Sequence, residues 1–181
     1  DLINFQLRGG AKWKWLGCEI KNGGHLNNTT NANTGTVEIY MIGNKFTNTE
    51  SYCHRDGFTV SSASSVIGVL WCKDNRVSSA AASKGLHVLQ GVGSMSNVQI
   101  TGNYVTGGKG GMWVGYVDNP AAASQNFNHA GIIIANNHLT NIDRAGETEV
   151  TACIKVHAAF TKIINNVCED VTNSSGSMDC I

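Results

Sequence analysis

The chain of 181 residues has little charge, a single proline and no long apolar run. Lys and Arg together number 13 and Asp and Glu also number 13, so the formal net charge is zero. A neutral chain lacks the long-range field that draws nucleic acid or an anionic membrane surface to a protein. No apolar run approaches the roughly 20 residues of a membrane-spanning helix. We therefore expect neither nucleic acid nor membrane insertion among the partners of this chain.

Glycine and asparagine are abundant, whereas the strong helix formers Glu, Lys and Leu are scarce. There are 21 Gly and 20 Asn residues, and the apolar residues between them are rich in Val and Ile. Gly and Asn tolerate the left-handed backbone angles of tight turns, and β-branched residues favour strands. The composition therefore predicts an all-β fold of strands joined by tight turns.

One residue pattern recurs along the chain. It consists of alternating apolar residues, a small or polar pair that ends in Asn, and a further apolar residue. Full copies cover residues 39–46, 70–77, 98–105, 132–139 and 161–168, and an earlier copy at 13–20 has Cys18 in place of the Asn. The Asn positions are Asn44, Asn75, Asn103, Asn137 and Asn166, which lie 31, 28, 34 and 29 residues apart. Such a period suits one coil of a β-solenoid with loops of varying length.

A second pattern, a small residue followed by apolar–any–apolar, falls between the copies of the first. It covers residues 57–60, 85–88, 111–114 and 153–156. Two interleaved families with one period predict two sheets of a solenoid, with Val98, Ile100 and Val105 inside and Tyr104 outside. The alternative is an antiparallel sandwich, but the hairpin signal Asn-Gly occurs only once, at residues 22–23.

The fixed place of Asn predicts a corner between the two sheets. We expect each Asn to adopt the left-handed bend while its amide bonds to its equivalents in the coils above and below, about 4.8 Å away. A second column four residues on predicts the next corner. Its members are Asn22, Asn48, Ser79, Gly107, Asn141 and Asp170.

Both repeated motifs resemble those of the right-handed single-stranded parallel β-helix of the pectate-lyase-like superfamily, and most of all a bacteriophage tailspike central domain. The resemblance covers nearly the whole chain and implies one domain, 1–181, of about six coils, cut mid-coil from a longer chain at both ends. It implies a bacterial surface polysaccharide (capsule or O-antigen) as ligand, usually cleaved, and a homotrimer. It also implies a virion or extracellular location after assembly in the bacterial cytosol, and no cofactor.

The six cysteines form no CxxC pair and no zinc-ligand spacing, so we expect no metal site. They are Cys18, Cys53, Cys72, Cys153, Cys168 and Cys180. The repeat places several of them in inward columns, where reduced Cys behaves as a small apolar residue. We therefore expect free thiols and assembly in a reducing compartment.

Outward residues of successive coils stack into columns, and the Gly-led sheet carries the candidate site. One column reads Thr59, His87, Trp113, Lys155, and the column two residues on reads Ser61, Leu89, Gly115, His157. Sugars stack on exposed aromatic rings, which favours Trp113 and Tyr116, and a long insertion at 117–130 follows them. The candidate substrate-binding residues are Arg55, Lys84, His87, Trp113, Tyr116, Lys155 and His157.

Glycoside hydrolysis needs two carboxyl groups that face one glycosidic bond. The candidates are Asp56, Glu147 and Glu149, which lie at or before this sheet. One alternative is a polysaccharide lyase, in which Lys155, His157, His87 and Arg55 supply a base and a cation. A second alternative is a non-catalytic β-helix that serves as a structural shaft or adhesin.

The other sheet is expected to expose Lys14, Tyr40, Trp71, Gln99, Ile133 and Lys162. Tyr40, Trp71 and Ile133 are large apolar groups turned outward, and we interpret them as a dry contact with another subunit. His25 and His138 are expected on other faces, outside the candidate site.

Overall fold

The computed structural model describes residues 4–6, 12–21, 25–28, 36–47, 58–62, 66–78, 86–90, 95–107, 112–116, 129–143, 153–156 and 160–172. All regular elements among these residues are β-strands, and they pair in parallel. No helix that could cross a membrane occurs in this part of the chain. The predicted all-β class with parallel strands is confirmed.

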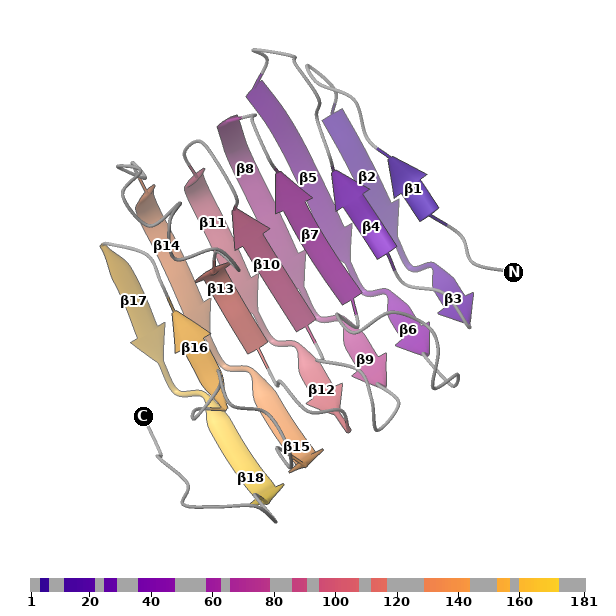
Figure 1. Ribbon diagram of the computed structural model, residues 1–181, viewed down its shortest axis with the longest axis vertical. Coiled ribbons are helices and arrows are strands. Elements are labelled where there is room, and N and C mark those ends of the chain that lie inside the picture. Colours follow the sequence, from indigo (N-terminus) through magenta and orange to yellow (C-terminus); the bar gives the residue numbers. More distant parts are fainter. Residues whose placement is uncertain are drawn as a thin grey trace.

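The strands form three parallel sheets of six strands each (Figure 1). Sheet A contains β1 (Asn4–Gln6), β4 (His25–Asn28), β7 (Phe58–Ser62), β10 (Leu86–Gln90), β13 (Met112–Tyr116) and β16 (Ile154–Val156). Sheet B contains β2 (Lys12–Leu16), β5 (Thr36–Ile42), β8 (Val66–Lys73), β11 (Met95–Thr101), β14 (His129–Ala135) and β17 (Thr161–Ile164). Sheet C contains β3 (Glu19–Lys21), β6 (Lys45–Thr47), β9 (Arg76–Ser78), β12 (Tyr104–Thr106), β15 (His138–Asp143) and β18 (Val167–Thr172).

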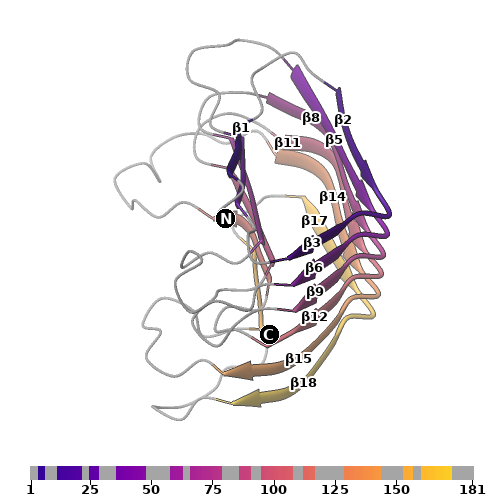
Figure 2. The ribbon, with the colours of Figure 1, turned by 90° about the vertical axis from the view of Figure 1, so that its right-hand side faces the viewer.

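Each strand pairs with the third strand after it, so the chain visits sheets A, B and C in turn. We call three consecutive strands, one from each sheet, a rung; β1–β2–β3 is rung 1 and β16–β17–β18 is rung 6. Figure 2 shows sheets B and C meeting at a corner that repeats from rung to rung. This order of parallel strands is compatible with a parallel β-helix.

Alternate residues of each strand enter the space between the sheets and form the core. In sheet B, the inward column before the corner contains Met41, Cys72, Ile100 and Ile134, all 0% exposed. Val98 and Val105 are also 0% exposed, whereas Tyr104 is 40% exposed, as the period-2 pattern predicts. Since each of these residues is covered by its equivalents in neighbouring rungs, the core is a set of stacked columns.

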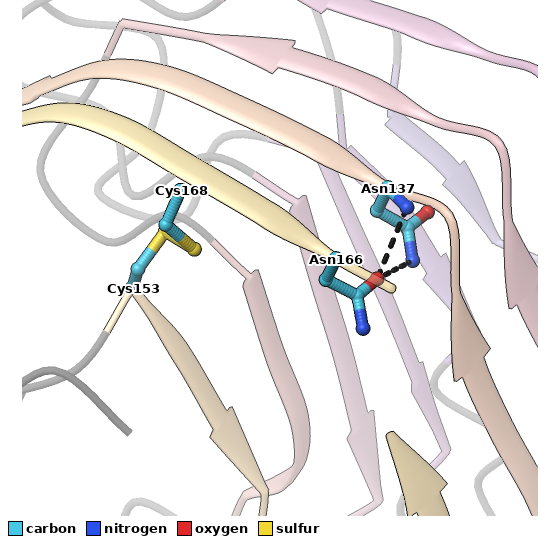
Figure 3. Close-up of a disulfide and its surroundings, with 4 residues drawn as sticks. All are labelled: Asn137, Cys153, Asn166 and Cys168. Carbon is cyan, nitrogen blue, oxygen red and sulfur yellow. Dashed lines mark hydrogen bonds between the residues drawn. A yellow bond between two sulfur atoms is a disulfide. The ribbon is translucent and has the colours of Figure 1, made fainter. Parts of the chain in front are cut away.

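The predicted Asn ladder runs along the corner between sheets B and C. The side-chain Nδ2 of Asn44 donates to Oδ1 of Asn75 at 2.9 Å, and Asn75 donates to Asn103 at 2.9 Å. The ladder continues from Asn103 to Asn137 at 2.9 Å and from Asn137 to Asn166 at 2.8 Å (Figure 3). This ladder confirms the prediction made from the spacing of the motif.

Backbone groups of the rungs on either side complete the bonding of each ladder amide. Asn103 illustrates the pattern: its Nδ2 also donates to the carbonyl of Cys72 at 2.8 Å, and its Oδ1 also accepts from the backbone N–H of Asn75 at 3.1 Å. Its side chain is buried, at 1% exposure, so these bonds replace water for a group that would be costly to bury alone. The ladder therefore holds each rung to the next at the corner.

The left-handed residue of this corner is the one before the ladder Asn, not the Asn itself as predicted. Positive φ angles occur at Gly17 (61°), Gly43 (66°), Asp74 (54°), Gly102 (67°), Asn136 (55°) and Asn165 (51°). Gly, Asn and Asp are the residues that adopt this conformation at least cost. The bend divides each Asn-containing segment into a strand of sheet B and a strand of sheet C, so two families of motif give three sheets.

The second predicted corner is described at three of its six positions. Gly107, Asn141 and Asp170 have φ angles of 76°, 54° and 50°. These values confirm a second column of left-handed residues in sheet C. Asn22, Asn48 and Ser79 lie outside the described residues.

The expectation that all cysteines are free thiols is wrong, because Cys153 and Cys168 form a disulfide (Figure 3). Their Cα atoms are 6.4 Å apart. Cys153 is buried immediately before β16, and Cys168 lies in the column of the buried Leu139, so both face the interior of rung 6. The period of the repeat relates equivalent positions of successive rungs, so it does not predict that these two inward positions of the same rung lie close together. Cys18 and Cys72 are free, and burial raises the pKa of the Cys72 thiol to about 12; Cys53 and Cys180 lie outside the described residues.

Candidate functional site

The predicted column of the Gly-led sheet is present in the register of sheet A. Thr59 pairs with His87, His87 with Trp113, and Trp113 with Lys155. The column extends to His25, which pairs with Thr59. The expectation that His25 lies on another face is therefore wrong, because the strand that carries it joins the same sheet before the first Gly-led motif.

The neighbouring column departs from prediction at a bulge. Leu89 pairs with Tyr116 and not with Gly115, because the register between β10 and β13 shifts after Val88. A bulge inserts one extra residue in one strand, which the motif spacing does not indicate. The shift brings Tyr116 into register with Ser61 through Leu89.

The structure does not describe the remaining residues of the predicted site. Asp56, Glu147, Glu149, Arg55, Lys84 and His157 lie outside the described residues, as does residue range 117–128 of the insertion. The predicted carboxyl pair therefore stays a prediction.

Sheet B presents a different cluster on its outward face. Registered residues of β2, β5 and β8 form a grid with Lys12, Lys14 and Leu16 on rung 1, Glu38, Tyr40 and Ile42 on rung 2, and Val69, Trp71 and Lys73 on rung 3. Six of them line a groove of about 360 Å³: Lys12, Lys14, Leu16, Tyr40, Ile42 and Trp71. We call this the lysine–aromatic groove. Its size lies at the lower end of the range for small-molecule sites.

Two aromatic rings line this groove. Tyr40 and Trp71 occupy the same column, and their ring centroids are 5.3 Å apart at 76°, an edge-to-face contact. Such a pair holds both rings in fixed orientations. Both residues are only half-buried, so part of each ring is open to a ligand.

Lysine ammonium groups lie around the aromatic pair. Lys73 Nζ lies 4.1 Å from the centroid of Trp71, and the Nζ atoms of Lys12 and Lys14 lie 5.2 and 6.0 Å from that of Tyr40. These are cation–π distances. A contact that excluded water would have to neutralise these charges, which weakens the interpretation of Tyr40 and Trp71 as a dry contact.

Glu38 is the single carboxylate of the grid, and its bonds within the protein are satisfied. Its Oε2 accepts from Lys12 Nζ at 2.9 Å and from the Tyr40 hydroxyl at 3.1 Å. The bond from Lys12, followed by that from Tyr40, holds the pKa of Glu38 below its usual value, while the bond to Glu38 raises the pKa of Lys12. Both groups are therefore ionised at neutral pH, and the tyrosine hydroxyl is fixed.

Sheet C carries a pair of residues that the sequence did not single out. His138 Nε2 bonds to Glu169 Oε1 on the next rung, and the Tyr104 ring packs edge-on against His138 with centroids 5.1 Å apart. His138 is the first residue after the ladder residue Asn137, and Glu169 is the third residue after Asn166 in the next rung. Aligning the two copies of the motif would therefore have placed these two side chains near each other. All three side chains lie on an open surface, where an ion pair contributes little.

No group of three or more His, Cys, Asp or Glu side chains suited to a metal ion occurs in the part of the chain that the structure describes. The sequence matches no protein-family model and no curated protein, and the structure matches no solved structure.

Proposed function

We propose that the chain is a segment of a right-handed, single-stranded parallel β-helix of the pectate-lyase-like kind. Three features support this proposal: parallel pairing of every third strand, one shared period and the continuous Asn ladder. In such a solenoid, residues about thirty apart in sequence become neighbours on a flat outer face. A long face of this kind suits an extended ligand.

The function that we propose is the binding of bacterial surface polysaccharide, capsule or O-antigen, as in a tailspike domain. One observation carries it: Tyr40 and Trp71 form a half-buried, edge-to-face aromatic pair in an open groove. The apolar C–H faces of sugars pack on such rings, whereas an ordinary solvent-facing column avoids them. The lysines beside the pair favour this use of sheet B over the dry subunit contact that the sequence suggested.

A second candidate face is the sheet A column, because its register brings His87, Trp113 and Lys155 together. Cleavage by hydrolysis remains part of the proposal and rests on Asp56, Glu147 and Glu149. New reducing ends without ultraviolet-absorbing unsaturated ends would indicate a hydrolase, and unsaturated ends would indicate a lyase. A polysaccharide that is bound but released intact would indicate an adhesin or shaft.

The homotrimer and the virion location are also proposals, carried over from the resemblance. Assembly in the bacterial cytosol loses the support that six free thiols would have provided, because one disulfide is present. Sedimentation of the protein with and without reductant measures the oligomeric state directly.

Trp71→Ala tests the binding face. We expect it to lower affinity for a bound capsular polysaccharide about tenfold, since loss of a stacking ring costs about 1–3 kcal/mol, and to leave the sedimentation coefficient unchanged. Trp113→Ala on sheet A is the matched control and should change affinity little. Loss of assembly in Trp71→Ala, with the affinity of the remaining assembly unchanged, would support the dry contact. Loss of affinity in Trp113→Ala alone would move the binding face to sheet A.

A further inference from the structure

The grid of residues that contains the lysine–aromatic groove has more positive charge than its one carboxylate can neutralise. Lys12, Lys14 and Lys73 lie beside the two rings, and Glu38 is the one acidic residue in the grid. Three positive charges and one negative charge leave a surplus of two. Because Glu38 already accepts from Lys12 and Tyr40, the surplus lies on Lys14 and Lys73.

These two lysines have no carboxylate within ion-pair distance among the described residues, whose ion pairs involve Lys12, Lys21, Lys45 and His138. Lys14 lies on rung 1 in register with Tyr40, and Lys73 lies on rung 3, two residues after Trp71 on the same strand. Two rungs correspond to about 10 Å, twice the spacing of adjacent strands. The two rings therefore have one lysine on the rung before Tyr40 and another beside Trp71.

We propose that the lysine–aromatic groove selects acidic glycans, with a sugar ring on Tyr40 and Trp71 and carboxylate or sulfate groups at Lys14 and Lys73. This inference rests on the proposed glycan-binding function and specifies its substrate class. It also gives a direction: a glycan that reaches both lysines must cross β2, β5 and β8 in succession, along the stack of rungs.

A single-stranded nucleic acid also combines anions with rings that stack. Two observations favour a glycan. The formal net charge of the chain is zero, and the groove is short, whereas nucleic-acid grooves carry basic residues along several phosphates. A nucleic acid is therefore a competing outcome of the experiment.

The probes are a panel of capsular polysaccharides that contain uronic acids, the same polysaccharides after chemical reduction of their carboxyl groups, dextran sulfate, dextran, and oligodeoxythymidylate. We expect binding to at least one uronate polysaccharide, with affinity about tenfold lower for its reduced form and falling as salt rises. Preference for the uronate form identifies carboxylate as the recognised anion. Preference for dextran sulfate over both the uronate forms and dextran identifies sulfate.

Substitutions test the named side chains. Lys14→Gln and Lys73→Gln should each lower affinity for the acidic form about two- to fivefold, as expected for exposed ion pairs, and should not change affinity for the reduced form. Glu38→Gln should raise affinity for the acidic form, because it removes the carboxylate that competes for Lys12. Lys45→Gln removes a lysine of sheet C that pairs with Glu19, and it is the matched control with no expected effect.

The outcomes separate the two proposals. If no polysaccharide of the panel binds in any form, the glycan-binding function itself fails. If acidic and reduced forms bind equally and the Lys14 and Lys73 variants bind like wild type, the selectivity fails while glycan binding stands. Tighter binding of oligodeoxythymidylate, with the same dependence on these lysines, would overturn the glycan in favour of nucleic acid.

Discussion

Rung 4 and rung 6 have the same residue pattern but differ in burial. Ile100 in rung 4 and Ile163 in rung 6 occupy the same inward column of sheet B, yet Ile100 is 0% exposed and Ile163 is 42% exposed. In sheet C, Val105 is 0% exposed, whereas Cys168, in the same inward column of rung 6, is exposed. The described residues beside rung 4 cover it on both sides, whereas those beside rung 6 cover it on one.

This comparison shows that the motif sets the direction of a side chain and the neighbouring rungs set its burial. In a solenoid, stability is approximately a sum over single repeats and the interfaces between neighbours. A residue of rung 4 belongs to two interfaces, and its equivalent in rung 6 belongs to one among the described strands. Equal substitutions in the two rungs should therefore have unequal effects.

The largest expected difference concerns the core column. Ile100→Ala should lower the free energy of unfolding by about 3 kcal/mol, because it removes buried apolar surface and leaves a cavity. Ile163→Ala should lower it by less than about 1 kcal/mol, since water already reaches that side chain. Urea unfolding of both variants measures the difference. Equal losses would show that another part of the chain covers rung 6.

A smaller difference is expected within the ladder. Asn103→Leu should lower the free energy of unfolding by about 2 kcal/mol, because it leaves the amide of Asn75 and the carbonyl of Cys72 without their partner. Asn166→Leu breaks the bonds from Asn137 and to the Ile134 carbonyl at a half-buried position, so we expect about half that loss. If Asn103→Leu unfolded at the same urea concentration as wild type, the ladder would not stabilise the fold.

The smallest difference concerns the left-handed corner. Gly102 and Gly43 have φ angles of 67° and 66°, so an alanine costs about 1 kcal/mol at either position. At Gly102 the added Cβ would also meet the Asp74 carboxylate, whereas at Gly43 nothing lies within 4 Å. Thermal unfolding should place Gly102→Ala below Gly43→Ala. The reverse order would mean that the Asp74 side chain moves aside without cost.

Much of the fold was predictable because the repeat is strict where rungs are bonded to each other. The spacing of Asn44, Asn75 and Asn103 predicted the ladder, and the spacing of the Gly-led motif placed His87, Trp113 and Lys155 in one column. Both predictions depend only on identical positions in successive rungs. A one-residue error in the period would have turned every side chain to the other face, so the pattern fixes the register strongly.

Other features of the fold depend on contacts that cannot be predicted from the period of the repeat. The bulge after Val88 shifts one strand pair, and the disulfide between Cys153 and Cys168 joins two positions within a rung. The pattern also assigned the left-handed conformation to the ladder Asn, although the residue before it takes that conformation in all five rungs that have this Asn, as does Gly17 before Cys18 in rung 1. The lysine–aromatic groove was missed because Lys12, Leu16 and Ile42 lie outside the column of Lys14, Tyr40 and Trp71.

The hydrogen bonds of the ladder predict how deamidation of a ladder Asn would affect the protein. From Asn44 to Asn137, the NH₂ group of each ladder amide donates forward to the Asn of the next rung and backward to a backbone carbonyl of the rung before. Deamidation of Asn103 would replace that NH₂ with an oxygen of the same size, 2.9 Å from Oδ1 of Asn137 and 2.8 Å from the carbonyl of Cys72. Two attractions would become two repulsions, and the buried position would carry a charge in place of a neutral amide. Deamidation of Asn103 hardly changes the size of the side chain, but it would weaken the contact between two rungs at this corner.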